Sequence, residues 1–218
     1  MKTIYFVRHG ETANNAAKRL NAPNTPLSEK GMRQAEDIAE RCKRIPIEVV
    51  VTSTMTRAKQ TGAVVSGGIG AHMESSELFV EGSYSSRLVD KAFSDPEVRS
   101  AFDAYHRNFE DPAYRFEDGE NFADLKKRAL AALKFLEGRS EENILVVSHA
   151  FFMWIIAAAA VFGSDLTAEE CKGVLRGFDL MENTALTVLT FDAPPRKAVG
   201  EPVSKWQLKV WNDHAHLG

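Results

Sequence analysis

Short apolar runs alternate along the chain with stretches in which apolar side chains recur at helical spacing. Residues 3–7 and 143–147 are short, largely apolar runs, typical of strands buried on both faces of a sheet. Residues 29–43 carry apolar side chains on one helical face, and Ser28 is placed to cap that helix. The same reasoning predicts strands at 47–51, 72–79, 184–191 and 206–211, and helices at 53–66, 96–109, 120–136, 151–162 and after Thr167. This alternation predicts an α/β fold.

Three segments interrupt the alternation. Thr52 and Ser53 are expected to cap the helix that runs to residue 66, and the glycine-rich residues 67–70 are expected to form a turn. Residues 80–120 are expected to be an excursion that lies over the sheet edge, and residues 192–204 form a loop rich in proline and glycine. Because no repeat and no clear boundary is visible in 218 residues, we expect a single domain.

The composition narrows the class of protein. Lysine and arginine number 27, aspartate and glutamate 30, and no basic run is present, which does not favour a nucleic-acid partner. Cys42 and Cys171 lack metal-ligand spacing and are expected to be reduced thiols. The first strand begins near Lys2, which leaves no room for a leader peptide, and the apolar run 151–162 is too short to span a bilayer. We therefore expect a cytoplasmic protein without a membrane partner, of unknown oligomeric state.

A histidine follows each of two apolar strands. His9 comes after residues 3–7, and His149 comes after residues 143–147. In open α/β sheets, ligands bind at the carboxyl ends of the strands, so two histidines delivered there indicate one shared site. A strand-terminal histidine taken alone is more often a structural residue than a catalytic one. The residues around it are needed to choose between these two interpretations.

Two arginines are expected at the same edge. Arg8 leaves its strand together with His9, and Arg57 falls in the first turns of the helix that follows strand 47–51. An arginine at such a position is commonly a solvated helix charge. Guanidinium groups bind tetrahedral oxyanions through paired hydrogen bonds, and helix N-termini add favourable partial charge. The two arginines and two histidines together therefore predict a site for a phosphoryl group.

Several motifs occur in a fixed order over most of the chain. They are Arg-His-Gly-Glu-Thr at 8–12 with Asn15, Pro-Leu-Ser-Glu-Lys-Gly at 26–31 with Gln34 and Ala35, Ser53 with Arg57, Ala58, Gln60 and Thr61, Ser-His-Ala at 148–150, and Asn183. With them, the sequence resembles the histidine phosphatase superfamily, also called phosphoglycerate mutase-like. The resemblance implies a three-layer α/β/α fold with a mostly parallel central sheet, in one histidine phosphatase domain.

The resemblance also implies a mechanism that uses no metal and no cofactor. His9 would attack phosphorus and become a phosphohistidine, while a backbone carbonyl holds its other N–H and Gly10 leaves room for that approach. Arg8, Arg57 and His149 would bind the phosphoryl oxygens. Asn15 resembles an accessory phosphate contact, although an asparagine near a helix start is commonly a cap.

A carboxylic acid is expected to protonate the leaving oxygen and then to activate water. In the family this acid follows the third strand region. Glu81 is the expected acid because it directly follows the apolar residues 78–80, and Glu77 is its rival. The family often has one residue between the leucine and the acid, whereas here there are two. Glu11 and Asp90 are the next candidates.

The sequence departs from the family pattern at several positions. The usual glycine after the second histidine is Ala150, and Asn21 stands near a second missing glycine, where it is expected to line the pocket. Asn183 is expected either to form a wall of the pocket or to be a turn residue. The mutases carry an Arg-Tyr-Gly stretch around the acid, and residues 81–87 differ from it. This difference favours hydrolysis of a phosphomonoester, the EC 3.1.3 class.

Two other functions stay open. A phosphotransferase of the phosphoglycerate mutase type would need a bisphosphorylated primer, and a non-catalytic module would only hold a phosphorylated ligand. Loss of His9 or Arg57 would have indicated the module, and both are present. Turnover of a generic aryl phosphate separates a module from an enzyme. A small phosphorylated substrate is expected, and its identity is not encoded in these motifs.

Overall fold

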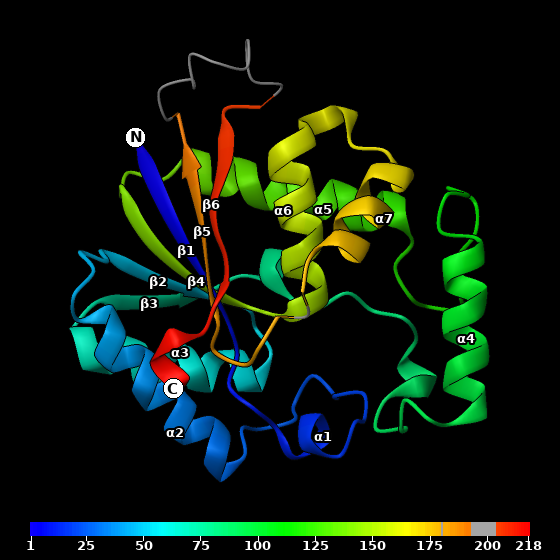
Figure 1. Cartoon of the computed structure of the whole chain (residues 1–218), viewed down its shortest axis with the longest axis horizontal. Coiled ribbons are helices and arrows are strands. Elements are labelled where there is room, and N and C mark those ends of the chain that lie inside the picture. The colour runs from blue at the N-terminus through cyan, green and yellow to red at the C-terminus, as the bar shows by residue number, and fades with distance from the viewer. Residues whose placement is uncertain (180, 193–203) are drawn as a thin grey trace.

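The computed structural model describes residues 1–179, 181–192 and 204–218. Its sheet has six strands in the order β3-β2-β4-β1-β5-β6 (Figure 1). The strands β1 to β4 pair in parallel, and β5 and β6 join antiparallel at one edge. Their bounds are Lys2–Arg8 (β1), Val49–Thr52 (β2), His72–Ser75 (β3), Asn143–Ser148 (β4), Leu186–Phe191 (β5) and Trp206–Asp213 (β6). The expectation of a mostly parallel sheet is therefore confirmed.

Helices cover both faces of the sheet. Val7 and Leu145 belong to an apolar cluster with α2 and α3, whereas Phe6 and Ile144 belong to a cluster with α5 and α6. Adjacent strand residues point to opposite faces, which explains why the central residues of β1 and β4 are apolar in succession. The helices are Ala13–Ala16 (α1), Glu29–Cys42 (α2), Thr56–Ile69 (α3), Pro96–Arg107 (α4), Phe122–Glu137 (α5), Ala150–Phe162 (α6) and Ala168–Gly177 (α7). The three-layer α/β/α architecture is confirmed.

Two of the predicted element boundaries are wrong. The helix α3 begins after Met55 and continues through the expected turn to Ile69, because the left-handed residue is Gly70, with φ of 70°. The strand β3 ends at Ser75, and Glu77–Phe79 form a 3-10 turn that buries Phe79 completely. Of the expected loop 192–204, residues 193–203 lie outside the described residues.

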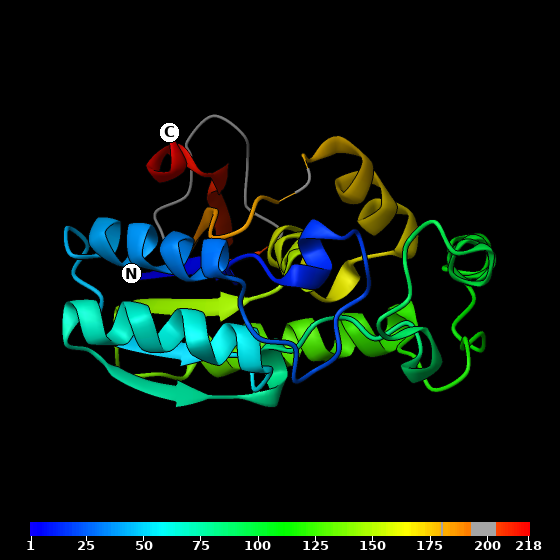
Figure 2. The same ribbon diagram turned by 90° about the horizontal axis from the view of Figure 1, so that it is seen from below.

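Residues 80–120 contain α4, which lies at one end of the molecule in both views (Figures 1 and 2). This segment is joined to residues 18–20 by backbone hydrogen bonds, from Leu20 N–H to the Lys91 carbonyl and from Phe93 N–H to the Lys18 carbonyl. Leu88, Val98 and Ala101 form a small apolar cluster of their own there. Throughout the described ranges, no helix combines the length and apolar character needed to cross a membrane.

Candidate active site

The two predicted histidines lie side by side. The strands β1 and β4 are neighbours in parallel register, with Arg8 opposite Ser148, so His9 and His149 follow at the same edge. Their ring centroids are 5.0 Å apart. Both side chains are buried, with 2 % of His9 and none of His149 exposed. The sheet register thus delivers both imidazoles to one place.

Two guanidinium groups converge on His9. Arg57, in the first turn of α3, donates from Nε to Nε2 of His9 at 3.1 Å and from a terminal nitrogen to the carbonyl of Ala22 at 3.0 Å. Arg8 donates to the carbonyl of Met181, and its buried Nε has no hydrogen-bond partner among the described residues. An anion placed here would find two charged donors next to the histidine.

The hydrogen bonds of His9 define its tautomer. Its Nδ1 lies 2.7 Å from the carbonyl oxygen of Gly10, which can only accept, so Nδ1 carries the proton. Its Nε2 therefore keeps a lone pair, which accepts from Arg57. A Cβ at position 10 would lie 2.4 Å from the carbonyl oxygen of Gly31, so this turn requires glycine.

The electrostatic setting keeps both imidazoles neutral. Burial lowers the pKa of His9 well below its ordinary value of 6.5, and the charges of Arg57 and Arg8 lower it further. Burial and the same arginines also hold the pKa of His149 well below 6.5. Burial lowers the pKa of Arg57 to about 10, which leaves the guanidinium charged at neutral pH. The site therefore combines neutral imidazoles with fixed positive charge.

These buried imidazoles predict a pH-dependent stability. In the unfolded chain both histidines regain ordinary pKa values and bind protons below about pH 6.5, whereas the folded protein excludes those protons. The free energy of unfolding should therefore fall as the pH decreases from 7 to 5. Urea unfolding at both pH values should show a smaller loss in His149→Gln than in the wild type. The exposed His72 provides the control variant, His72→Gln, and an equal loss in all three proteins would contradict the argument.

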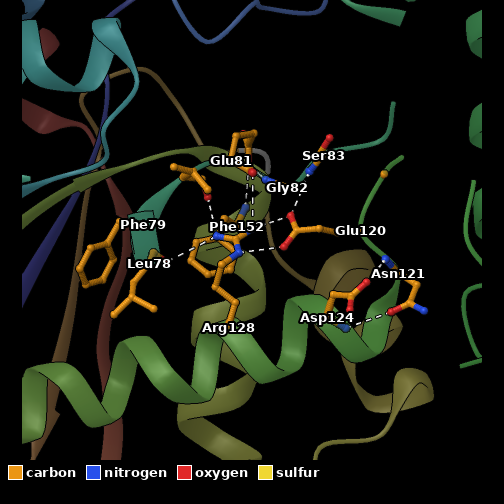
Figure 3. A network of polar contacts seen from close by, with 12 residues as sticks. Leu78, Phe79, Glu81, Gly82, Ser83, Glu120, Asn121, Asp124, Arg128 and Phe152 are labelled. Carbon is orange, nitrogen blue, oxygen red and sulfur yellow. Dashed lines mark hydrogen bonds and ion pairs between the residues drawn. The ribbon is translucent and has the colours of Figure 1, made fainter. Parts of the chain in front are cut away.

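Glu81 lies at the N-terminus of α6 (Figure 3). One carboxylate oxygen accepts from the backbone N–H of Phe152 at 2.9 Å and from that of Gly82 at 3.0 Å. The side chain lines the same cavity as His9 and also an adjoining depression, whereas Glu77 lines only the adjoining depression. Glu81 and His9 thus share a cavity, and Glu77 lies outside it.

The two reserve candidates for the acid are held by other groups. Glu11 also lines the cavity, but its carboxylate accepts from the hydroxyl of Ser28 at 3.2 Å and pairs with Lys30 at 3.0 Å. Asp90 accepts from the side chain of Asn14 at 2.7 Å and is absent from the cavity wall.

Three asparagines and one alanine were also expected at the site, and all four line the cavity. Asn183 donates to the backbone carbonyl of His9 at 2.9 Å. Asn15 forms a reciprocal capping box with Thr12, and the Thr12 hydroxyl also donates to Asn21 at 2.7 Å. Ala150 is the first residue of α6. Asn15 therefore takes part in capping α1, as the partner of the N-cap residue Thr12. Because it also lines the cavity, the contact between Asn15 and phosphate stays a prediction.

His149 is completely buried next to His9 and is not among the residues that line the cavity. Its Nε2 lies 2.8 Å from the hydroxyl of Ser53, and its buried Nδ1 has no partner in the part of the chain that the structure describes. The cavity itself has a volume of about 670 Å³. Besides the residues already named, its wall contains Lys18, Arg19, Leu20, Pro23, Met55, Gly82, Ser83, Tyr84, Ser85, Val89, Phe93, Phe102, Phe151 and Trp154.

Sequence reasoning missed a buried arginine near Glu81. Arg128, on α5, donates to the carbonyl of Val80 at 2.7 Å and binds both carboxylate oxygens of Glu120, at 2.8 and 2.7 Å (Figure 3). Its guanidinium also lies over the ring of Phe152, 3.7 Å from the centroid. In the sequence, Arg128 is one charge among several on an amphipathic helix, and nothing there distinguishes it.

This arrangement can bind a tetrahedral oxyanion. Charged guanidinium donors, a neutral imidazole lone pair and a carboxyl group share one cavity. Within the described ranges, no three His, Cys, Asp or Glu side chains are grouped so that they could hold a metal ion.

Comparisons with known proteins show which family and fold the chain resembles. The sequence model of the histidine phosphatase superfamily (branch 1) matches residues 4–200. The protein named "Probable phosphoglycerate mutase GpmB" of Yersinia pestis is 29% identical over 222 residues, covering 100% of this chain and 95% of that protein. Among solved structures, Bacillus stearothermophilus YhfR has a TM-score of 0.77 at 25% identity, with full coverage of both chains. A mycobacterial glucosyl-3-phosphoglycerate phosphatase complexed with VO3 has a TM-score of 0.76 at 22% identity, covering 98% of this chain and 100% of that one.

Proposed function

Because the chain belongs to the histidine phosphatase superfamily, we propose that it hydrolyses a phosphomonoester through a phosphohistidine on His9. The observation that carries the proposal is the Nε2 lone pair of His9, which accepts from Arg57 in a cavity that Arg8 also lines. The reaction class is a phosphomonoesterase (EC 3.1.3) without cofactor, acting on a small phosphorylated substrate. Location in the cytoplasm and the single domain, with residues 80–120 over the active site, stay predictions.

In the first step, His9 Nε2 attacks phosphorus, a nitrogen–phosphorus bond forms and the ester P–O bond breaks. In the free protein Arg57 donates a hydrogen bond to this same lone pair. Before attack, Arg57 must therefore give up this hydrogen bond and donate to a phosphoryl oxygen instead. Arg8, Arg57 and His149 stabilise the charge that develops on those oxygens. Glu81 protonates the alcohol oxygen that leaves.

In the second step, water attacks the phosphohistidine. Glu81, now a carboxylate, takes a proton from that water while the nitrogen–phosphorus bond breaks and inorganic phosphate forms. Asn183 holds the backbone of His9, and Gly10 holds its ring, so the imidazole keeps its orientation through both steps. The nucleophile is regenerated in the tautomer in which it began.

Turnover of p-nitrophenyl phosphate, with trapping of an acid-labile phosphohistidine, tests this proposal. Release of phosphate without a primer supports hydrolysis. Absence of turnover, with binding of phosphate retained, would instead support a non-catalytic module. A phosphotransferase is the second candidate, because a relative matched over the whole chain is named as a phosphoglycerate mutase. It would need a bisphosphoglycerate primer and would interconvert phosphoglycerates faster than it releases phosphate.

Activity should be unchanged by EDTA and inhibited by vanadate. The proposed charge stabilisation comes from Arg8, Arg57 and His149, so removal of divalent metal should not alter kcat/KM. Vanadate resembles five-coordinate phosphorus and should bind beside His9, as a transition-state analogue does. The mycobacterial phosphatase named above was solved with VO3. Restoration of lost activity by Mg²⁺ or Zn²⁺ after chelation would contradict this expectation.

A further inference from the structure

The cavity is much larger than a phosphoryl group needs. Its volume of about 670 Å³ falls in the range of pockets that enclose most of a small organic ligand, roughly 300–1,000 Å³. Arg8, His9 and Arg57 occupy one part of its wall. The rest of the cavity is therefore available to the alcohol portion of the ester, and its chemistry should select that portion.

Five aromatic side chains line this cavity, and four of them are joined by ring contacts into one wall. The ring of Tyr84 lies 4.2 Å from that of Phe102 and 5.5 Å from that of Phe151, and Phe102 lies 5.9 Å from Phe93. Trp154, one turn further along α6 than Phe151, completes the wall. These rings come from three separate segments of the chain, and here they face a common space. Such a surface binds flat or aliphatic groups by excluding water.

Phe93 supplies an independent indication. It is 46% exposed, and it is one of only four large hydrophobic side chains that are exposed in the described part of the chain. Exposed apolar surface costs free energy when it remains in contact with water, and within a cavity it typically marks a ligand contact. We propose that the substrate is a phosphomonoester of an apolar alcohol, whose aliphatic or aromatic group packs against Phe93, Phe102 and Tyr84. This inference rests on the proposed phosphatase function.

A second anionic group on the substrate is the rival interpretation. Lys18 and Arg19 also line the cavity and are exposed. They would suit the carboxylate of a phosphoserine or a phosphoglycerate. Arg19 already donates to the carbonyl of Asp90 at 3.0 Å, whereas the joined rings present a larger apolar surface to the cavity. The apolar alcohol is therefore favoured, and the experiment includes both kinds of ester.

A homologous series of alkyl phosphates tests the inference. The leaving alcohols from methyl to hexyl have similar acidity, so differences in kcat/KM report binding of the chain. Each added methylene should raise kcat/KM about fourfold until the wall is filled, which corresponds to about 0.8 kcal/mol for a buried CH₂. A flat series, or a preference for phosphoserine or 3-phosphoglycerate over hexyl phosphate, would overturn the inference. No turnover of any ester, p-nitrophenyl phosphate included, would instead overturn the phosphatase function.

Phe93→Ser locates the effect on this wall. The variant should lower the ratio of kcat/KM for hexyl phosphate to kcat/KM for methyl phosphate at least tenfold. Val161→Ser is the matched control, because Val161 is 40% exposed and lies outside the cavity, and it should leave the ratio unchanged. An unchanged ratio in Phe93→Ser, with a steep series in the wild type, would show that the alkyl chain binds elsewhere.

A largely buried ion pair holds the segment that carries Glu81. Arg128 and Glu120 are only 14% and 22% exposed, and they are joined by two short hydrogen bonds. The remaining donors of Arg128 reach the carbonyls of Val80 at 2.7 Å and of Leu78 and Glu81 at 3.4 Å. Glu120 also accepts from the N–H of Ser83 at 3.2 Å. The pair therefore binds the backbone on both sides of Glu81 (Figure 3).

We infer that Arg128 is a positioning residue for Glu81. Residues 80–83, which follow the 3-10 turn, form neither a strand nor a helix that would fix the Glu81 backbone. One guanidinium, oriented by Glu120 and by the face of Phe152, provides that fixation. Lysine cannot reproduce it, because its single ammonium lacks the planar fork that reaches several acceptors at once.

Leaving-group dependence tests this role. Arg128→Met should lower kcat for an alkyl phosphate at least tenfold more than kcat for p-nitrophenyl phosphate, Glu120→Gln should act in the same direction, and Arg128→Lys should be intermediate. The control is Arg115→Met, which breaks the more exposed ion pair with Asp124 and should leave the ratio unchanged. Equal loss on both esters would mean that Arg128 only supports the fold. Absence of the effect in Glu81→Gln as well would overturn the role of Glu81 and this inference together.

Discussion

His9→Ala should keep less than about one hundredth of the wild-type kcat/KM and should remain folded. Loss of the nucleophile removes the covalent route, and a hundredfold loss corresponds to only about 2.7 kcal/mol of barrier, so the expected effect is larger than this limit. His9 lies at the end of β1 and belongs to none of the apolar clusters among the described residues, which is why the fold should persist. Initial rates measure the loss of kcat/KM, and far-UV circular dichroism measures whether the variant remains folded.

The structure refines the stability part of that expectation. Only 2% of His9 is exposed and it accepts a hydrogen bond from Arg57, so its replacement by alanine removes buried contacts. His9→Asn, which retains a polar group, is therefore the second variant, and His72→Ala is the control for loss of a histidine elsewhere. No phosphohistidine should be trapped in either His9 variant. A folded His9→Ala that retains more than a hundredth of the activity would show that another residue attacks phosphorus.

The fold and the centre of the site could be predicted because both depend on local pattern. Largely apolar runs mark β1 and β4, and parallel strands end at a common edge, so His9 and His149 had to lie near one another if these strands were neighbours. Arg57 follows β2 by a short turn, and β2 is paired with β4. The positions of His9, His149 and Arg57 thus follow from the ends of strands, and strand ends can be recognised in a sequence.

The aromatic wall and Arg128 could not be predicted, because they depend on contacts between distant segments. Tyr84 meets Phe151 across 67 positions of chain, and Arg128 reaches the carbonyl of Val80 across 48. An aromatic or charged residue in a helix or loop has the same appearance in sequence whether it faces a cavity or solvent. The end of β3 was misjudged for a related reason, because the burial of Phe79 against Phe6 and Phe135 favours a 3-10 turn over a longer strand.

Glu81→Gln should lower kcat/KM for an alkyl phosphate by roughly 10²-fold or more, the usual scale for loss of a general acid. An alkoxide needs a proton while the bond breaks, whereas nitrophenolate leaves without help. Glutamine keeps an oxygen that can accept from the N–H groups of Phe152 and Gly82, so the backbone should stay in place. Phosphorylation of His9 by the aryl ester should be much less affected. Hydrolysis of the intermediate still needs the base, so a burst of nitrophenol and a trapped phosphohistidine should appear.

Glu77→Gln is the matched control for this experiment. Glu77 is one turn earlier in the chain, does not line the cavity that contains His9, and should be nearly silent on both esters. If Glu77→Gln showed the leaving-group dependence and Glu81→Gln did not, the two carboxyl groups would have exchanged roles. If both were silent, the acid would have to be Glu11 or Asp90. Glu11 would then come first, because it lines the cavity, although its carboxylate must first leave Ser28 and Lys30.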